Sequence, residues 1–351
     1  MSQSGIYGRS DVGALDRSLA LPARLTFFTE LEAGPLTALF SKRDVVDRLV
    51  ALKATVSMGI LDFCDERARV VRELNVRGVP VVAWQLLSKE KGYWYHLNNA
   101  PDAVERYEQF CEWTQKEGLQ WDAIGIDIEP DINEVQQLLR HDFRTLSAFL
   151  KRIWNKEKFA KSCAIYASLV ARMRADGYEV QSYECFFMAD ERKVGSSLLN
   201  RIFGLASVPA DKRVAMLYSS YFGPIGVGVL GIYARAADAA AIGITGGGVE
   251  LEGLRNKEPM SWDEFSRDLR IANSCCGDVH IFSLEGCEER GYLGRLSEFD
   301  WSKKAACPLL WSALLSVARW LALGALWLFA RPAYLVAAAA AAAVLLWEFL
   351  D

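Results

Sequence analysis

The chain has 351 residues, and its 40 Lys and Arg against 44 Asp and Glu give a formal net charge of −4 at pH 7. This length fits two ordinary domains or one large α/β barrel, and the lack of a basic surplus excludes nucleic acid as an expected partner. Hydrophobic residues make up 52% of the chain and charged residues 24%, a composition that excludes a disordered protein.

Eight short apolar runs follow a polar leader over residues 1–23. The runs are nearly continuous rather than alternating, and most are rich in β-branched or aromatic residues, as is typical of parallel strands that are covered on both faces. The predicted strands are Leu25–Thr29, Ala54–Leu61, Val79–Leu87, Ala123–Ile128, Tyr178–Phe187, Arg213–Ser219, Ala241–Thr245 and Val279–Leu284.

The segments between these runs predict amphipathic helices, among them Ala103–Glu117, Asn133–Ile153, Phe159–Ala175 and Trp262–Asn273. Strands that alternate with helices over residues 24–301 predict a (β/α)8 TIM barrel, with a doubly wound open sheet as the alternative. Because no GxGxxG follows the first strand, we expect no dinucleotide cofactor, and no other cofactor is predicted.

The cysteines and the N-terminus indicate the compartment. The 8 cysteines form no CxxC pair and have no His partners, so no structural metal site is expected. The N-terminal residues lack the apolar core of a signal peptide, and free thiols favour a reducing compartment. We therefore expect the barrel on the cytosolic side.

Residues 302–351 are predicted to be a membrane anchor. Residues 308–330 and 333–350 are each long enough to cross a hydrocarbon layer of about 30 Å, and the Arg331-Pro332 pair between them allows a tight turn. The sequence therefore predicts a transmembrane helical hairpin, which makes the protein a multi-pass protein of the lipid bilayer. This arrangement places the charge of Arg319 near the middle of the first helix, which makes insertion less favourable. A single anchor and a tail docked on another subunit are the alternatives, and the oligomeric state is left open.

Carboxylates and aromatic residues gather where the predicted strands end, which is where TIM barrels carry their active sites. Asp127 and Glu129 share one strand face, about 6 to 7 Å apart along it, and paired carboxylates carry out glycoside hydrolysis. Glu285, after the eighth strand, is the candidate nucleophile or base. Glu30 and Glu32 follow the first strand. The predicted substrate contacts are Tyr218, Trp84, Asp62, Glu184, Tyr221 and Trp94.

The segment Trp121–Pro130 resembles the fourth-strand motif DGxDxDxE of the family 18 glycoside hydrolases, the chitinase-like barrels. Asp122, Asp127 and Glu129 fall on its first, sixth and eighth positions. The resemblance implies that Glu129 is the general acid and that Asp127 orients the N-acetyl group of the substrate. Met216-Leu-Tyr218-Ser219 is similar to the family's MxYD, whose Tyr helps to hold that group. Gly125 and Ser219 depart from the two motifs, since each stands where the family has an Asp.

Together these features predict a membrane-anchored glycoside hydrolase, or a hydrolase-like protein, that acts on a glycan or glycolipid by carboxylate acid/base chemistry. Two alternatives remain. A non-catalytic glycan-binding or scaffold barrel would explain the missing acids at positions 125 and 219. A divalent-metal enzyme acting on a phosphate-bearing lipid would use Asp62, Asp127, Glu129 and Glu184 as ligands.

Overall fold

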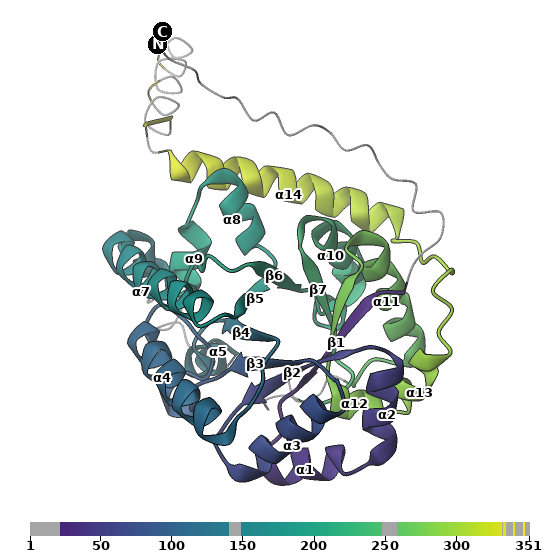
Figure 1. Ribbon diagram of the computed structural model, residues 1–351. Coiled ribbons are helices and arrows are strands. Elements are labelled where there is room, and N and C mark those ends of the chain that lie inside the picture. Colours follow the sequence, from purple (N-terminus) through teal and green to yellow (C-terminus); the bar gives the residue numbers. More distant parts are fainter. Residues whose placement is uncertain are drawn as a thin grey trace, which may run out of the picture.

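A computed structural model of the chain describes residues 22–139, 149–247 and 258–331, together with residues 333, 334, 340 and 347. Its strands are all parallel, pair in chain order and close into a barrel through pairing of the last strand with the first (Figure 1). The closed ring confirms the TIM-barrel prediction and excludes the open sheet. The strands are β1 (Arg24–Thr29), β2 (Thr55–Ile60), β3 (Val81–Gln85), β4 (Ala123–Ile128), β5 (Glu179–Cys185), β6 (Lys212–Met216), β7 (Ala239–Gly243) and β8 (Asp278–Phe282).

Helices surround the barrel. They are α1 (Ala33–Phe40), α2 (Arg43–Ala51), α3 (Asp65–Val76), α4 (Ala100–Glu117), α5 (Ile132–Leu139), α7 (Lys156–Ala175), α8 (Met188–Val194), α9 (Leu198–Phe203), α10 (Gly226–Tyr233), α11 (Trp262–Cys275), α12 (Leu284–Glu289), α13 (Tyr292–Ser297) and α14 (Leu309–Ala330). Short 3₁₀ helices are η1 (Lys89–Lys91), η2 (Arg152–Trp154), η3 (Ser219–Ile225) and η4 (Ala234–Ala236).

The predicted helices are found with small shifts. The helix predicted over Asn133–Ile153 corresponds to α5 at its start and to helical residues 149–154 at its end. Residues 140–148 of that prediction lie outside the described part of the chain. The α4 helix stops at Gly118, whose φ of 62° lies in the left-handed region that favours glycine, as the sequence indicated.

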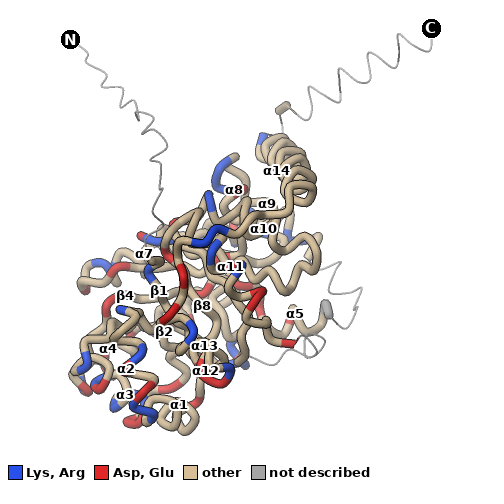
Figure 2. Tube along the Cα trace, turned by 90° about the vertical axis from the view of Figure 1, so that its right-hand side faces the viewer, with Lys and Arg blue, Asp and Glu red and all other residues tan. Residues whose placement is uncertain are grey.

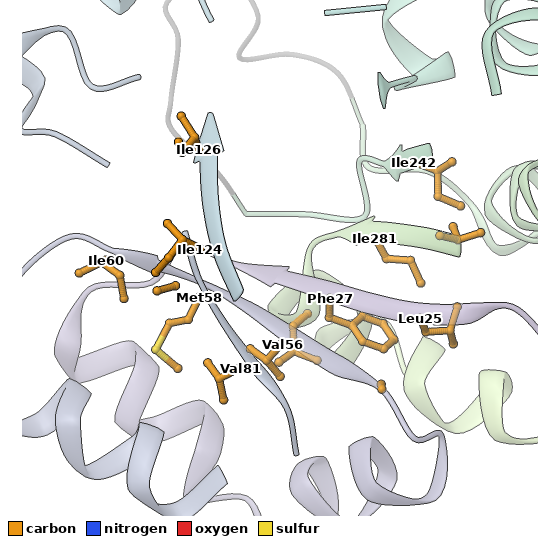
Figure 3. Close-up of a cluster of buried hydrophobic side chains, with 14 of the residues drawn as sticks. Leu25, Phe27, Val56, Met58, Ile60, Val81, Ile124, Ile126, Ile242 and Ile281 are labelled. Carbon is orange, nitrogen blue, oxygen red and sulfur yellow. The ribbon is translucent and has the colours of Figure 1, made fainter. Parts of the chain in front are cut away.

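The strands bury both of their faces, which explains why their sequences read as continuous apolar runs. One face points outward and packs against the helices, with Phe27, Val56 and Ile126 among its members (Figure 3). The other face fills the lumen with a smaller cluster that includes Trp84 and Tyr183. Side chains alternate between the two faces along each strand, so the phase of this alternation decides which residues reach the lumen.

The α14 helix lies along the outside of the barrel, packed against α8 and α10 and touching α9 and η3 (Figure 1). Its Arg319 faces the barrel, where Nε and Nη2 donate hydrogen bonds of 2.8 and 2.7 Å to Oδ1 of Asp190. The Arg319 guanidinium also lies 4.2 Å from the centre of the Tyr233 ring, whose hydroxyl donates to Asp190 at 2.7 Å.

Within the described residues, α14 is the one helix that is long and apolar enough to cross a membrane. The second helix of the predicted hairpin, residues 333–350, lies almost entirely outside the described part of the chain. The structure therefore contains one candidate helix, and the hairpin stays a prediction.

Candidate functional site

A cavity of about 490 Å³ opens at the C-terminal ends of the barrel strands. Carboxyl side chains contribute Glu30, Asp127 and Glu129 to its wall. Aromatic side chains form most of the rest, namely Phe28, Trp84, Trp94, Tyr183, Phe186, Phe187, Tyr218, Tyr221, Phe222 and Phe282. The remaining described wall residues are Val135, Cys185, Met216, Ile244 and Gly247. A concave, mostly apolar site with a few convergent polar groups is the usual form of a ligand pocket.

Asp127 and Glu129 enter this cavity from the end of β4, as the alternation along that strand predicted. Burial raises the pKa of Asp127 well above its ordinary value, and the negative charges of Glu129 and Glu30 raise it further. Burial also raises the pKa of Glu129, to about 7, although its hydrogen bond with Asp127 acts in the opposite direction. Near neutral pH this pair therefore holds at least one proton, as a general acid requires.

Glu30, directly after β1, is a third carboxyl in the same cavity. It accepts a hydrogen bond from the Tyr93 hydroxyl. Burial raises the pKa of Glu30 to about 8 against this hydrogen bond, and the charges of Glu285 and Glu129 add to the rise. The sequence placed Glu30 at the rim but gave no reason to select it, because a lone Glu after a strand is also typical of a solvated loop.

Four of the predicted substrate contacts lie on the cavity wall: Trp84, Trp94, Tyr218 and Tyr221. Trp84 has a further role, since its indole Nε1 donates a hydrogen bond of 3.2 Å to Oδ2 of Asp127. This bond orients the Asp127 carboxyl within the cavity and acts to lower its pKa.

Glu285, predicted as the nucleophile or base, does not belong to the cavity wall. It lies in the first turn of α12 and is close to Gly247, which does line the cavity. The two are so close that a Cβ added to Gly247 would come 2.4 Å from Oε1 of Glu285. Burial raises the pKa of Glu285. Its influence on the site is electrostatic, because it faces Glu30 and raises the pKa of that carboxyl.

Glu184 lies on the outer side of the barrel. Tyr183 and Cys185 on either side of it reach the cavity, so the alternation of β5 turns Glu184 outward. There it pairs with Arg192 at 2.6 Å and accepts a hydrogen bond of 2.7 Å from the Ser182 hydroxyl. The structure therefore does not bring Glu184 to the substrate.

Asp62 is also outside the cavity, held by Arg67 of α3. Nε and Nη2 of Arg67 donate hydrogen bonds of 3.1 and 3.0 Å to its two carboxylate oxygens. Partial burial acts to raise the pKa of Asp62, but the hydrogen bonds from Arg67 and Cys64 outweigh it and lower the pKa to about 2. This ion pair anchors the start of α3.

The alternative of a divalent-metal enzyme requires Asp62, Asp127, Glu129 and Glu184 to bind one metal ion. Within the ranges that the structure describes, no three His, Cys, Asp or Glu side chains converge in a way that could hold a metal ion. The separation of Asp62 and Glu184 from Asp127 and Glu129 removes two of the four ligands of the metal-enzyme alternative.

No known family model matches the sequence, and no curated protein matches it either. Among solved structures, the glycoside hydrolase domain of PgaB (BpsB) from Bordetella bronchiseptica is 10% identical, with a TM-score of 0.48 over 79% of this chain and 98% of that one. A modular endo-β-1,4-mannanase of glycoside hydrolase family 26 from Cellulomonas fimi is 10% identical, with a TM-score of 0.37 over 72% of this chain and 67% of that one.

A third similar structure, a fusion of a xylose isomerase-like TIM barrel with 4-hydroxyphenylpyruvate dioxygenase, is 9% identical, with a TM-score of 0.40 over 75% of this chain and 39% of that one. Likenesses of this size carry no chemistry over to this chain, which has to be derived from its own residues.

Proposed function

We propose that this barrel is a glycoside hydrolase with Glu129 as its general acid. The observation that carries the proposal is the Asp127–Glu129 pair, which shares one aromatic-lined cavity at the strand ends and has raised pKa values. Among the described residues, no Lys or Arg forms an ion pair with either carboxyl, so an ion-pair role does not account for them.

The reaction begins when Glu129 donates its proton to the glycosidic oxygen. As the bond between this oxygen and the anomeric carbon breaks, positive charge develops on the sugar ring. The carboxylate that Glu129 becomes on losing its proton favours that charge electrostatically, and the low dielectric of the cavity strengthens the interaction. Flat sugar faces stack on Trp84 and Trp94, which line the cavity.

The nucleophile of the reaction is the acetamido oxygen of the substrate itself, as the resemblance to the chitinase-like barrels implies. This oxygen bonds to the anomeric carbon as the glycosidic bond breaks. Water, which gives a proton back to the Glu129 carboxylate, then opens the cyclic intermediate and releases the sugar. Glu285 is off the cavity wall, and Glu30, with its pKa raised to about 8, is protonated near pH 7 and therefore a poor nucleophile. Asp127 and Tyr218 are in place to orient an acetamido group, since both line the cavity beside Glu129. The proposed substrate is thus an N-acetylhexosaminide.

The test is hydrolysis of fluorogenic 2-acetamido-hexosides, with the corresponding hexosides that lack the acetamido group run in parallel. Glu129→Gln should lower kcat by about 10²- to 10⁴-fold without a large change in Tm. Asp122→Asn is the matched control, because Asp122 is an exposed carboxylate just before the same strand. Full activity of Glu129→Gln overturns the assignment. Cleavage of the hexosides as fast as the acetamido substrates overturns the substrate-assisted route.

The same experiment distinguishes the proposed hydrolase from a non-catalytic glycan-binding barrel. In that case wild-type protein binds the 2-acetamido-hexosides but releases no product, and Glu129→Gln leaves the binding affinity unchanged.

A further inference from the structure

The wall of the site cavity combines two kinds of surface. Glu30, Asp127 and Glu129 contribute carboxyl groups, whereas Phe186, Phe187 and Phe222 contribute a purely apolar surface. Among the described wall residues there is no Lys, Arg, His, Asn or Gln, the side chains that usually hold the hydroxyl groups of a long free glycan. The apolar surface therefore suits an apolar group attached to the sugar.

This apolar surface is physically connected to α14. The Phe186 ring packs against the Phe222 ring at 5.6 Å and against the Tyr233 ring at 4.7 Å. Tyr233 in turn lies under the guanidinium of Arg319, in the middle of α14, at 4.2 Å. A chain of three ring and cation contacts thus joins the cavity wall to the helix.

A second cavity, of about 540 Å³, lies between η3 and the start of α14. Its wall includes Ser219, Ser220, Gly223 and Pro224 of η3 as well as Pro308 and Trp311, and it is completed by Val227, Glu258, Met260, Glu264 and Arg267. Tyr221 and Phe222, from the same 3₁₀ helix, line the site cavity. The η3 segment is therefore the wall that separates the carboxyl site from a hollow beside α14.

The outer face of α14 is apolar and carries no charge. Leu314, Trp320 and Leu321 have 53%, 70% and 71% of their surface exposed. Arg319, the one charged residue in the sequence 309–330, turns inward to Asp190, and α14 is accordingly tan along almost its whole length in Figure 2. An uncharged apolar face with three Trp along the helix suits contact with lipid, since Trp is enriched at membrane–water interfaces.

We propose that α14 lies along the surface of a bilayer and that the substrate is a glycolipid, an inference that rests on the proposed function. The acyl chains stay in the bilayer beside α14, and the sugar enters the carboxyl site at the mouth that Tyr221 and Phe222 of η3 line. A lipid surface fits this face better than a protein partner does, because the face offers no charge for recognition and the sequence that follows, 333–350, is apolar enough to enter the bilayer. The side-on packing of α14 against α8 and α10 favours a helix in the membrane plane over a helix that spans it.

The first experiment measures flotation of the full-length protein with phosphatidylcholine vesicles. Leu314→Glu/Leu321→Glu places two charges on the outer face of α14, and we expect flotation to fall by at least about tenfold. Val76→Glu is the matched control, because Val76 is an apolar residue 86% exposed on α3, away from α14, and this variant should float like wild type. Flotation of the double variant at the wild-type level overturns the proposal. So does a wild-type protein that fails to float and instead forms a dimer that the double variant abolishes.

The second experiment compares N-acetylhexosaminyl diacylglycerol in phosphatidylcholine vesicles with the methyl glycoside of the same sugar. Wild type should cleave the vesicle-bound substrate at least about tenfold faster, because the bilayer raises its local concentration. The double variant should lose this advantage and keep its rate on the methyl glycoside. Equal wild-type rates on both substrates overturn the glycolipid inference and leave the proposed function intact. If neither substrate is cleaved, the proposed function fails, and the flotation result still decides whether the outer face of α14 binds the bilayer.

Discussion

The hydroxyl of Tyr183 occupies the place in the barrel lumen that a side chain at position 125 would need, since a Cβ on Gly125 would lie 2.4 Å from it. The same hydroxyl is hydrogen-bonded to Ser57 Oγ at 2.7 Å. The resemblance to the chitinase-like motif is broken at position 125 for this steric reason. A phenol from the neighbouring strand stands where the family has an Asp.

Gly125→Ala should therefore destabilise the fold by about 1–3 kcal/mol through overpacking. Tyr183 cannot move aside, because its ring is buried and packs edge-on against Phe28 at 4.8 Å. Chemical denaturation of the variant measures the change. The same substitution in a Tyr183→Leu background should cost less, since Leu lacks the atoms that the new methyl group meets. An equal cost in both backgrounds would show that Tyr183 is not the obstacle.

Glu30 should make the protein less stable as the pH rises from about 4.5 to about 8. Its pKa is about 8 in the folded protein against an ordinary value of 4.5, so between these values the folded state binds a proton that the unfolded state has lost. The stabilisation is complete below about pH 4.5 and is lost as the pH passes 8. Tm measured against pH should fall less steeply for Glu30→Gln than for wild type.

The control for this titration is Glu32→Gln, which alters a carboxyl two residues away that is not part of the cavity wall. It should preserve the wild-type slope. Identical slopes for wild type and Glu30→Gln would refute the assignment of the buried proton to Glu30.

The hydrolytic rate should decline above about pH 7. Glu129 acts as an acid and must be protonated, and burial raises its pKa to about 7. The pH profile of kcat/KM reports the ionisation of the free enzyme, so its alkaline limb should fall in this region. A limb that begins near pH 4.5, the ordinary range of a Glu side chain, would indicate that Glu129 is exposed to water or is not the acid.

Arg319→Ala should loosen α14 from the barrel. The variant leaves Asp190 buried without its cation, and removing one partner of a buried pair costs about 3–5 kcal/mol. Hydrogen exchange should then accelerate in α14 while the strands keep their protection. Lys193→Ala is the control, since the exposed Lys193 lies over Trp320 of α14 at 5.4 Å and a contact of this kind contributes only about 0.5–1 kcal/mol. Equal acceleration in both variants would argue against the Arg319–Asp190 pair as the attachment.

The barrel was predictable because its strands are buried on both faces. A run such as Ala123–Ile128 has the same bounds in the sequence prediction and in the structure. It was harder to predict which residues of each strand point into the lumen, because a continuously apolar strand gives no sign of which face turns inward. For this reason the sequence did not indicate that Glu184 lies outside the cavity, whereas the acidic pattern of Asp127 and Glu129 indicated which face of β4 turns inward.

The remaining parts of the site depend on contacts between distant segments. Glu30 is significant only because Tyr93, Glu129 and Glu285 surround it, and no local pattern in the sequence connects these residues. Arg319 is a similar case. In the sequence it is an unfavourable charge within a membrane helix, whereas in the structure Asp190 of α8 neutralises it.

The pairing of β8 with β1, which sets Phe282 beside Phe28, has a consequence for the order of assembly. Glu30 and Glu285 come from opposite ends of the barrel sequence, and they become neighbours only when the last strand joins the first. Before β8 joins β1, this part of the barrel edge is open, and we expect water to reach Glu30 and to bring its pKa back toward the ordinary value. We therefore expect the raised pKa of Glu30 only in chains whose last strand has paired with the first.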